Sequence, residues 1–198
     1  MKKLALCIIL LLSIFIVTAC KKEDFILSAD EVTSNTILMK QDGSLQVALV
    51  ESFDKTYYSL SELEEFVMAE INKYNKEIGS EVITMLDRQL NNGNAVIILN
   101  YAGMGHYATF NNVIAAYFNT NQATDDFPLP DSFVSAKDRK PVSLVKVLDS
   151  KFKVLAIEGA YDIIVEGNIK YYTDNAKLIN NNKVQSNDDG LSVVVYKP

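Results

Sequence analysis

His106 and the segment around it are the residues whose types and spacing most directly suggest chemistry. His106 is the only histidine of the chain, and it could act as a general base with Asp87 or Glu51 as its orienting carboxylate. It lies within residues 103–108, Gly-Met-Gly-His-Tyr-Ala, which match the dinucleotide-binding pattern G-x-G-x-x-G/A. Asp125 follows about twenty residues later, but no second apolar strand leads to it, as a dinucleotide-binding unit requires. We therefore interpret the glycines as part of a turn and His106 as a surface or capping residue.

Two pairs of tyrosines are the other candidate functional residues. Tyr57 and Tyr58 precede an acidic segment, and Tyr171 and Tyr172 lie in a run of β-forming residues near the C-terminus. Their aromatic faces could stack on a sugar or a peptide, so we retain all four as candidate ligand or partner contacts. The alternative is that one tyrosine of each pair packs inward, as alternate residues of a strand do.

The N-terminus has the composition of a secretory signal. Lys2 and Lys3 precede an apolar run over residues 4–19, and the small residue Ala19 stands before Cys20. Residues 17–20, Val-Thr-Ala-Cys, resemble a bacterial lipobox, which implies a diacylglycerol on the Cys20 thiol and cleavage before Cys20. Two acyl chains anchor a protein stably, because each buried CH₂ contributes ~0.8 kcal/mol.

We therefore predict lipidation of Cys20, membrane lipid as its partner, and a position at the outer face of the cell membrane. The alternatives are an ordinary signal peptide that happens to contain a cysteine and an N-terminal helix that is not cleaved.

Residue counts limit metal and redox chemistry. Once Cys7 leaves with the signal, Cys20 is the only thiol, so a disulfide framework and a cysteine-based zinc site are excluded. One histidine excludes a multi-histidine metal site. Three acidic groups could bind calcium, namely Glu62 with Glu64 and Glu65, Asp125-Asp126 and Asp188-Asp189, but none has the ligand spacing of a calcium-binding loop. We expect solvated faces and turns there. The sequence predicts no metal and no cofactor.

The length and the net charge of the chain limit the classes of function that remain. Removal of residues 1–19 leaves 179 of the 198 residues and changes the formal net charge from −6 to −8, because two lysines and no acid are lost. A chain of this size can bury a sizeable core. The acidic balance argues against nucleic-acid binding, which needs clustered Lys and Arg. No second apolar run approaches the ~20 residues of a membrane span.

Residue patterns predict the elements that must position these candidates. Residues 36–50 predict a hairpin, and residues 82–101 predict a second one, although its first arm could instead be helical. Residues 61–78 have an apolar stripe at spacings of three and four and predict an amphipathic helix that ends at Gly79. Apolar residues at similar spacing predict a second helix over residues 107–119. From Phe152 onward, short β-type runs alternate with turn signals.

These elements predict an α+β fold. N-terminal hairpins and two amphipathic helices would pack on an antiparallel sheet, with a C-terminal β-rich meander. We divide the chain into a signal peptide over residues 1–19, a lipidated tether over 20–34 and an extracytoplasmic domain over 35–198. A division of that domain into two packed parts near residues 130–150 is the alternative.

Short motifs along the mature chain also suggest a relationship. They include residues 50–53, Val-Glu-Ser-Phe, after Asp42-Gly43, then Tyr107–Asn111 and Gly167–Tyr171. With these motifs, most of residues 35–197 resemble uncharacterised cell-surface lipoproteins of low-GC Gram-positive bacteria. The resemblance implies an extracytoplasmic α+β domain and no particular reaction or ligand.

We expect a lipid-anchored binding or envelope-structural module. The alternative is a cell-envelope hydrolase with paired carboxylates, because such chemistry needs neither a thiol nor a second histidine. A transporter's solute receptor is a third class, but 179 residues are few for its two α/β lobes. A pocket with two carboxylates facing each other would favour the hydrolase, and a shallow apolar or aromatic surface would favour binding.

Overall fold

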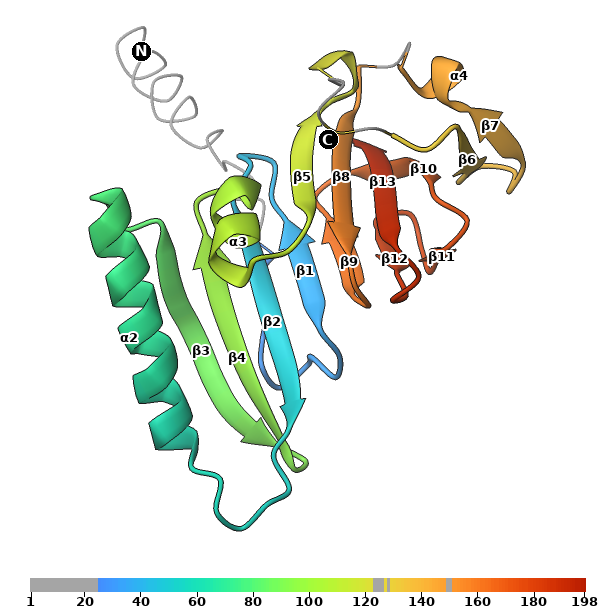
Figure 1. The fold of residues 1–198 in the computed structure, drawn as a ribbon. Helices are drawn as coiled ribbons and strands as arrows, with labels where there is room; N and C mark the ends of the chain where they lie inside the picture. Colours follow the sequence, from blue (N-terminus) through green and yellow to red (C-terminus); the bar gives the residue numbers. More distant parts are fainter. Residues whose placement is uncertain (1–24, 123–126, 128, 149–150) are drawn as a thin grey trace, which may run out of the picture.

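The computed structural model describes residues 25–122, 127, 129–148 and 151–198, which form two β-sheets with three α-helices (Figure 1). The signal segment, Cys20, and the acidic pair Asp125-Asp126 lie outside the described residues. The predicted α+β class is confirmed, with both N-terminal hairpins and a C-terminal segment rich in strands. Within the described part of the chain, no helix is long and apolar enough to cross a membrane.

Seven strands form the first sheet: β1 (Thr36–Met39), β2 (Leu45–Ser52), β3 (Ile83–Asn91), β4 (Asn94–Tyr101), β9 (Asp162–Val165), β11 (Lys177–Leu178) and β12 (Lys183–Gln185). Their order is β11-β12-β9-β1-β2-β4-β3. The pairs β1–β2 and β3–β4 are the two predicted hairpins, and the first arm of the second is a strand. The strand β9 pairs parallel with β1, whereas β1–β2 and β2–β4 are antiparallel.

Six strands form the second sheet: β5 (Ala115–Asn119), β6 (Ser132–Ser135), β7 (Pro141–Ser143), β8 (Lys153–Glu158), β10 (Asn168–Tyr172) and β13 (Leu191–Lys197). Their order is β5-β8-β13-β10-β6-β7, and neighbouring strands are antiparallel. The C-terminal strands are divided between the sheets, because β9, β11 and β12 join the first and β8, β10 and β13 join the second. The C-terminal segment therefore links the two sheets.

One hydrophobic core joins the two sheets. Its buried side chains include Ile37 and Leu99 from the first sheet and Leu155 and Tyr196 from the second. Residues before and after 130–150 contribute to the same cluster. Side chains on both sides of residues 130–150 therefore pack into a single buried cluster.

The segment before β1 covers the other face of the first sheet. Leu27, Ala29 and Val32 are buried against residues such as Leu38 and Ile98, which alternate with the residues that face the main core. The backbone N–H of Leu27 also donates to Gln46 Oε1 at 2.9 Å. The predicted tether over residues 20–34 is therefore too long, because the second face of the sheet needs apolar cover and three residues of this polar-looking segment supply it.

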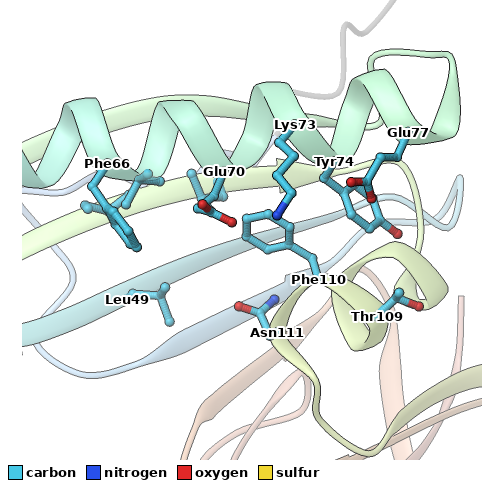
Figure 2. Close-up of a pocket in the computed structure, with 12 residues that line it drawn as sticks. Leu49, Phe66, Glu70, Lys73, Tyr74, Glu77, Thr109, Phe110 and Asn111 are labelled. Atoms are coloured by element: carbon cyan, nitrogen blue, oxygen red, sulfur yellow. The ribbon is translucent and has the colours of Figure 1, made fainter.

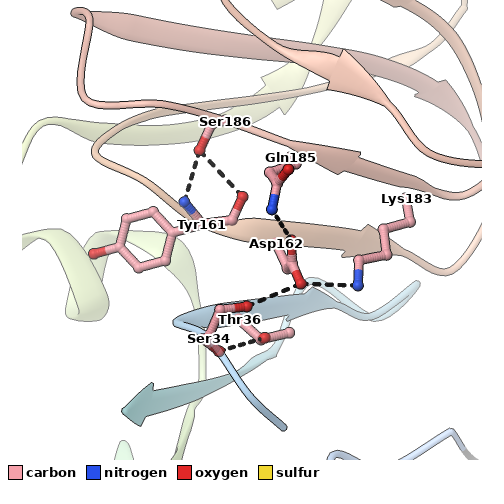
Figure 3. Close-up of polar contacts among 7 residues, drawn as sticks. All are labelled: Ser34, Thr36, Tyr161, Asp162, Lys183, Gln185 and Ser186. Carbon is pink, nitrogen blue, oxygen red and sulfur yellow. Dashed lines mark hydrogen bonds and ion pairs between the residues drawn. The ribbon is translucent and has the colours of Figure 1, made fainter. Parts of the chain in front are cut away.

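Polar contacts at Asp162 fix this segment to the C-terminal strands (Figure 3). The Asp162 carboxylate accepts from Ser34 Oγ at 3.0 Å and forms an ion pair with Lys183 Nζ at 2.9 Å. Gln185 Nε2 donates to its other oxygen at 3.3 Å. The backbone N–H of Asp162 donates to the Asn35 carbonyl at 2.8 Å. These bonds lie at the start of the parallel β1–β9 pair and set its register.

The helix α2 (Leu60–Ile78) follows the predicted stripe. The Ser59 side chain caps its first turn, and Gly79 ends it in the left-handed conformation with φ of 80°. Ile71 is buried, and three other residues of the stripe are half-buried: Leu63, Val67 and Tyr74. In Figure 1, α2 runs alongside the edge strand β3. The helix is therefore attached at the margin of the sheet, where it covers less of the sheet than a central position would.

The second predicted helix, over residues 107–119, is wrong in its second half. The helix α3 (Met104–Asn111) ends where Asn112 adopts a left-handed φ of 52°, and β5 begins at Ala115. The strand β5 pairs along β8, and the Tyr117 hydroxyl lies 3.0 Å from that of Tyr196. This long-range pairing overrides the local helical spacing. Two short elements complete the fold: η1 (Thr120–Gln122) and α4 (Leu144–Leu148).

Candidate functional site

A groove of about 490 Å³ lies between α2 and α3 over the strands β2 and β4 (Figure 2). Its floor is apolar and consists of Leu49 from β2 with Ile97 and Leu99 from β4. Val67 from α2 and Phe110 from α3 continue the apolar surface up the two walls. Because α2 sits over the edge strand and α3 follows β4, the sheet between the helices is left open.

The α2 wall presents one exposed aromatic ring and a row of charges. Phe66 is 64% exposed at the groove. Glu70, Lys73 and Glu77 follow it at spacings of three and four residues, which place them on the same side of the helix. Figure 2 shows these side chains pointing from α2 toward the strands. A ligand in the groove would therefore meet an apolar floor, two carboxylates and one ammonium group.

Tyr74 ties the two helices together. Its hydroxyl lies 3.3 Å from His106 Nδ1, and its ring meets the Phe110 ring edge-on at 5.5 Å between centroids. Thr109 and Asn111 supply the polar groups of the α3 wall. Asn111 Nδ2 donates to the Tyr107 carbonyl at 2.9 Å, so this side chain is held against its own helix. The Tyr74 contacts fix the spacing of the groove walls.

Among the described residues, no hydrogen bond joins His106 to Asp87 or Glu51. The Tyr74 hydroxyl lies beside His106 Nδ1, whereas Asp87 on β3 accepts from the backbone N–H of Arg88. The dinucleotide pattern also has the wrong surroundings, because β5 after α3 pairs antiparallel with β8 in the other sheet. Gly103 lies with an extended φ of 178° in the bend between β4 and α3, whereas Gly105 lies inside α3, so the predicted glycine turn is found at Gly103 alone.

Buried tyrosines lie behind Phe110. Burial raises the pKa of Tyr101 to about 12, although the hydrogen bond from Asn111 opposes the rise. Burial also raises the pKa of Tyr107, whose hydroxyl lies 2.9 Å from that of Tyr161. These phenols remain neutral at physiological pH. They support the α3 wall by packing and hydrogen bonding.

The four predicted tyrosines lie in two separate places, and none lines this groove. Tyr57 and Tyr58 are 75% and 45% exposed in the loop before α2, and the Tyr58 ring lies 4.9 Å from that of Phe53. Both therefore face outward. Tyr171 and Tyr172 alternate as strand residues do, because Tyr172 is buried while Tyr171 lines a second hollow.

Sequence reasoning missed the groove because its residues come from four elements that meet only in the folded chain. The one available signal was Phe66, an apolar residue beside the stripe on an otherwise polar side of α2. No group of three His, Cys, Asp or Glu side chains in the described ranges could hold a metal ion. The groove is interpreted from its own geometry, since no protein-family model, no curated protein and no solved structure matches the chain.

Proposed function

We propose that the protein is a lipid-anchored extracytoplasmic lipoprotein that binds a ligand with an apolar body between α2 and α3. The observation that carries this proposal is the apolar floor of the groove, where Leu49 is half-buried above the buried Ile97 and Leu99. Small-molecule sites are hollows of ~300–1,000 Å³ with mostly apolar lining and a few polar groups. The groove, at about 490 Å³, has that size and that lining.

The charges at the rim favour a neutral or cationic ligand. Glu70 and Glu77 contribute two negative charges along the α2 wall, and Lys73 contributes one positive charge between them. An anionic head group would have to lie beside both carboxylates, which costs electrostatic energy in a partly desolvated groove. An apolar chain or ring with an amine end would satisfy both the floor and the rim.

A hydrolase with paired carboxylates fits the groove less well. Glu70 and Glu77 lie seven residues apart on one helix, which is ~10 Å along its axis. The opposite wall contributes Thr109, Phe110 and Asn111 and no carboxylate. Paired-carboxylate hydrolysis needs the two acids on opposite sides of the bond to be cleaved. The arrangement therefore supports binding.

The anchor is supported by the lipobox-like residues 17–20, and Phe25, the first described residue, follows Cys20 by five positions. Replacing Cys20 by Ala should abolish membrane retention, because the acyl chains have no other attachment point. Cell fractionation measures this. The matched control is Cys7→Ala, which alters the other cysteine and leaves the lipobox intact. A processed Cys20→Ala chain that remains in the membrane at the wild-type level would contradict the anchor.

Ligand binding is tested with residues 20–198 carrying Cys20→Ser, a chain that keeps every described residue. The probe is N-phenyl-1-naphthylamine, whose fluorescence rises in apolar surroundings. We expect saturable binding, and displacement at a lower concentration by dodecylammonium than by dodecanoate. Phe66→Ser should weaken probe binding several-fold, because this exposed ring extends the apolar contact without supporting the core.

The matched control for Phe66→Ser is Val145→Ser. Val145 is 72% exposed on α4 and does not line the groove. Its replacement should leave probe affinity unchanged. Absence of saturable binding to the parent chain, or equal losses in the two variants, would overturn the groove as the binding site.

A further inference from the structure

A second hollow, of about 840 Å³, lies between the turn that joins β6 to β7 and the strand β10. It shares no lining residue with the groove between α2 and α3. Its charged lining residues are five cations and one acid: Lys137, Arg139, Lys140, Lys146, Lys170 and Asp138. The chain as a whole has a formal net charge of −6. This basic hollow therefore has the opposite charge to the protein that contains it.

Among the described residues, none of the five cations forms an ion pair, and Asp138 is the one carboxylate in the lining. The ion pairs found in the described ranges lie elsewhere, at Lys55–Asp54, Arg88–Glu64 and Lys183–Asp162. The Ser135 side chain donates to the Asp138 carboxylate within the same turn and lowers its pKa, and the positive charge of Lys140 also lowers it. Five positive charges gathered beside one carboxylate repel one another, and a bound anion would relieve that repulsion.

Arg139 is fixed at the edge of the basic hollow. Its φ of 61° is left-handed, and the other non-glycine residues with positive φ in the described ranges are asparagines, which tolerate this conformation better. Its Nη1 donates to the Tyr172 hydroxyl at 2.9 Å, and its guanidinium carbon lies 6.0 Å from the centre of that ring. One side of the guanidinium is thus held by Tyr172, and its remaining N–H groups are left for a ligand.

The rest of the lining suits a neutral ring or hydroxyl-rich group. The Tyr171 ring is half-buried and lies 6.3 Å from that of Phe152. Asn180 and Asn181 add amide groups from the turn between β11 and β12. An aromatic face with amides beside it is a common combination for contact with a sugar.

We propose that the basic hollow binds a phosphate-bearing ligand, with Arg139, Lys140 and Lys170 around the phosphate and Tyr171 against its neutral part. Arginine pairs with two phosphate oxygens at once, and lysines act as point charges. A soluble sugar phosphate and a phospholipid head group offer the same phosphate chemistry. The experiment therefore includes one arm for each source.

The test uses residues 20–198 with Cys20→Ser. In the first arm, calorimetry measures binding of glucose 6-phosphate with glucose as the uncharged control. In the second, the chain is sedimented with phosphatidylglycerol vesicles, with phosphatidylcholine vesicles as control. We expect binding in at least one arm, weakening as the salt concentration rises.

The double variant Arg139→Gln with Lys140→Gln should reduce affinity about tenfold or more, since it removes two charge-assisted contacts. The matched control is Lys55→Gln with Lys76→Gln, which changes the net charge equally on exposed residues outside both sites.

The arms identify the source of the phosphate. Binding of glucose 6-phosphate that falls in the double variant supports a soluble ligand, and Tyr171→Ser should then weaken glucose 6-phosphate more than inorganic phosphate. Binding to phosphatidylglycerol vesicles alone, lost in the same variant, assigns the phosphate to a lipid head group. No binding in either arm, or equal losses in the double variant and its control, overturns the proposal.

Discussion

The groove between α2 and α3 and the basic hollow beside β10 are open for different physical reasons. The groove is open because α2 covers the margin of the first sheet, so the half-buried Leu49 of β2 remains accessible from one side. The hollow is bounded by turns, and its cations are largely exposed side chains that pack little. The shape of the groove therefore depends on the packing of the core, whereas the hollow is defined by the positions of its charged side chains.

This difference predicts that the two sites can be separated by mutation. Residues that position α2 belong to the main core, so damage to them should impair both stability and the groove. Residues of the turn between β6 and β7 should affect phosphate binding with little effect on stability. The variants below test this separation.

The largest effect is expected for Ile71→Ala. Ile71 is the buried residue of α2, and its truncation leaves a cavity where the helix meets the sheet. The free energy of unfolding should fall by ~2–5 kcal/mol, measured by denaturant titration. Under conditions where the variant remains folded, binding of the apolar probe should weaken while phosphate binding is retained. A near-neutral effect on stability would mean that Ile71 does not hold α2 in place.

The elements that could be predicted from the sequence are those whose signals lie within one short stretch of the chain. The helix α2 was predictable because Ser59, the stripe around Ile71 and Gly79 all lie within one continuous segment. The hairpins were predictable because Asp42-Gly43 and Asn92-Gly93 join adjacent strands. Each of these signals acts between residues that are close in the chain.

Features that depend on distant residues were not predictable in the same way. The end of α3 is set by the pairing of β5 with β8, and the burial of Leu27 depends on a sheet face built from later strands. The hollow needs Lys140 and Lys170 to meet, and the backbone bond from Ala136 to the Lys170 carbonyl brings these segments together. Of the four tyrosines predicted as contacts, Tyr171 lines a candidate site. Nothing in the sequence indicated that cationic side chains would lie beside it.

High pH should destabilise the protein through its buried phenols. The pKa of Tyr101 is raised from 10.0 to about 12, which corresponds to ~3 kcal/mol. The folded state holds the proton of the Tyr101 phenol more tightly than the unfolded state does. Its stabilisation of the folded state is therefore complete below pH 10 and is lost as the pH rises toward 12. Denaturant titrations at increasing pH measure the decline. Stability that stays constant over this range would show that Tyr101 ionises freely in the folded protein.

Arg139→Gly separates binding from stability at the basic hollow. Glycine adopts the left-handed φ of 61° without steric cost, which offsets the lost contact with the Tyr172 hydroxyl. The free energy of unfolding should therefore change by no more than about 1 kcal/mol in either direction. Phosphate affinity should fall in the same variant. A loss of stability well beyond that limit would mean that the Arg139–Tyr172 contact is structural.

The smallest stability effect is expected for Lys73→Ala, which removes an exposed side chain from the groove wall of α2. Lys73 makes no ion pair within the described ranges, so removing it should change the free energy of unfolding by less than about 0.5 kcal/mol. The substitution should change ligand preference more than stability, because Glu70 and Glu77 then face the groove without a positive charge between them. The preference for dodecylammonium over dodecanoate should therefore increase, while phosphate binding at the basic hollow stays the same. A change in phosphate binding would show that the two sites are coupled, and an unchanged ligand preference would mean that the ligand does not reach the charges of α2.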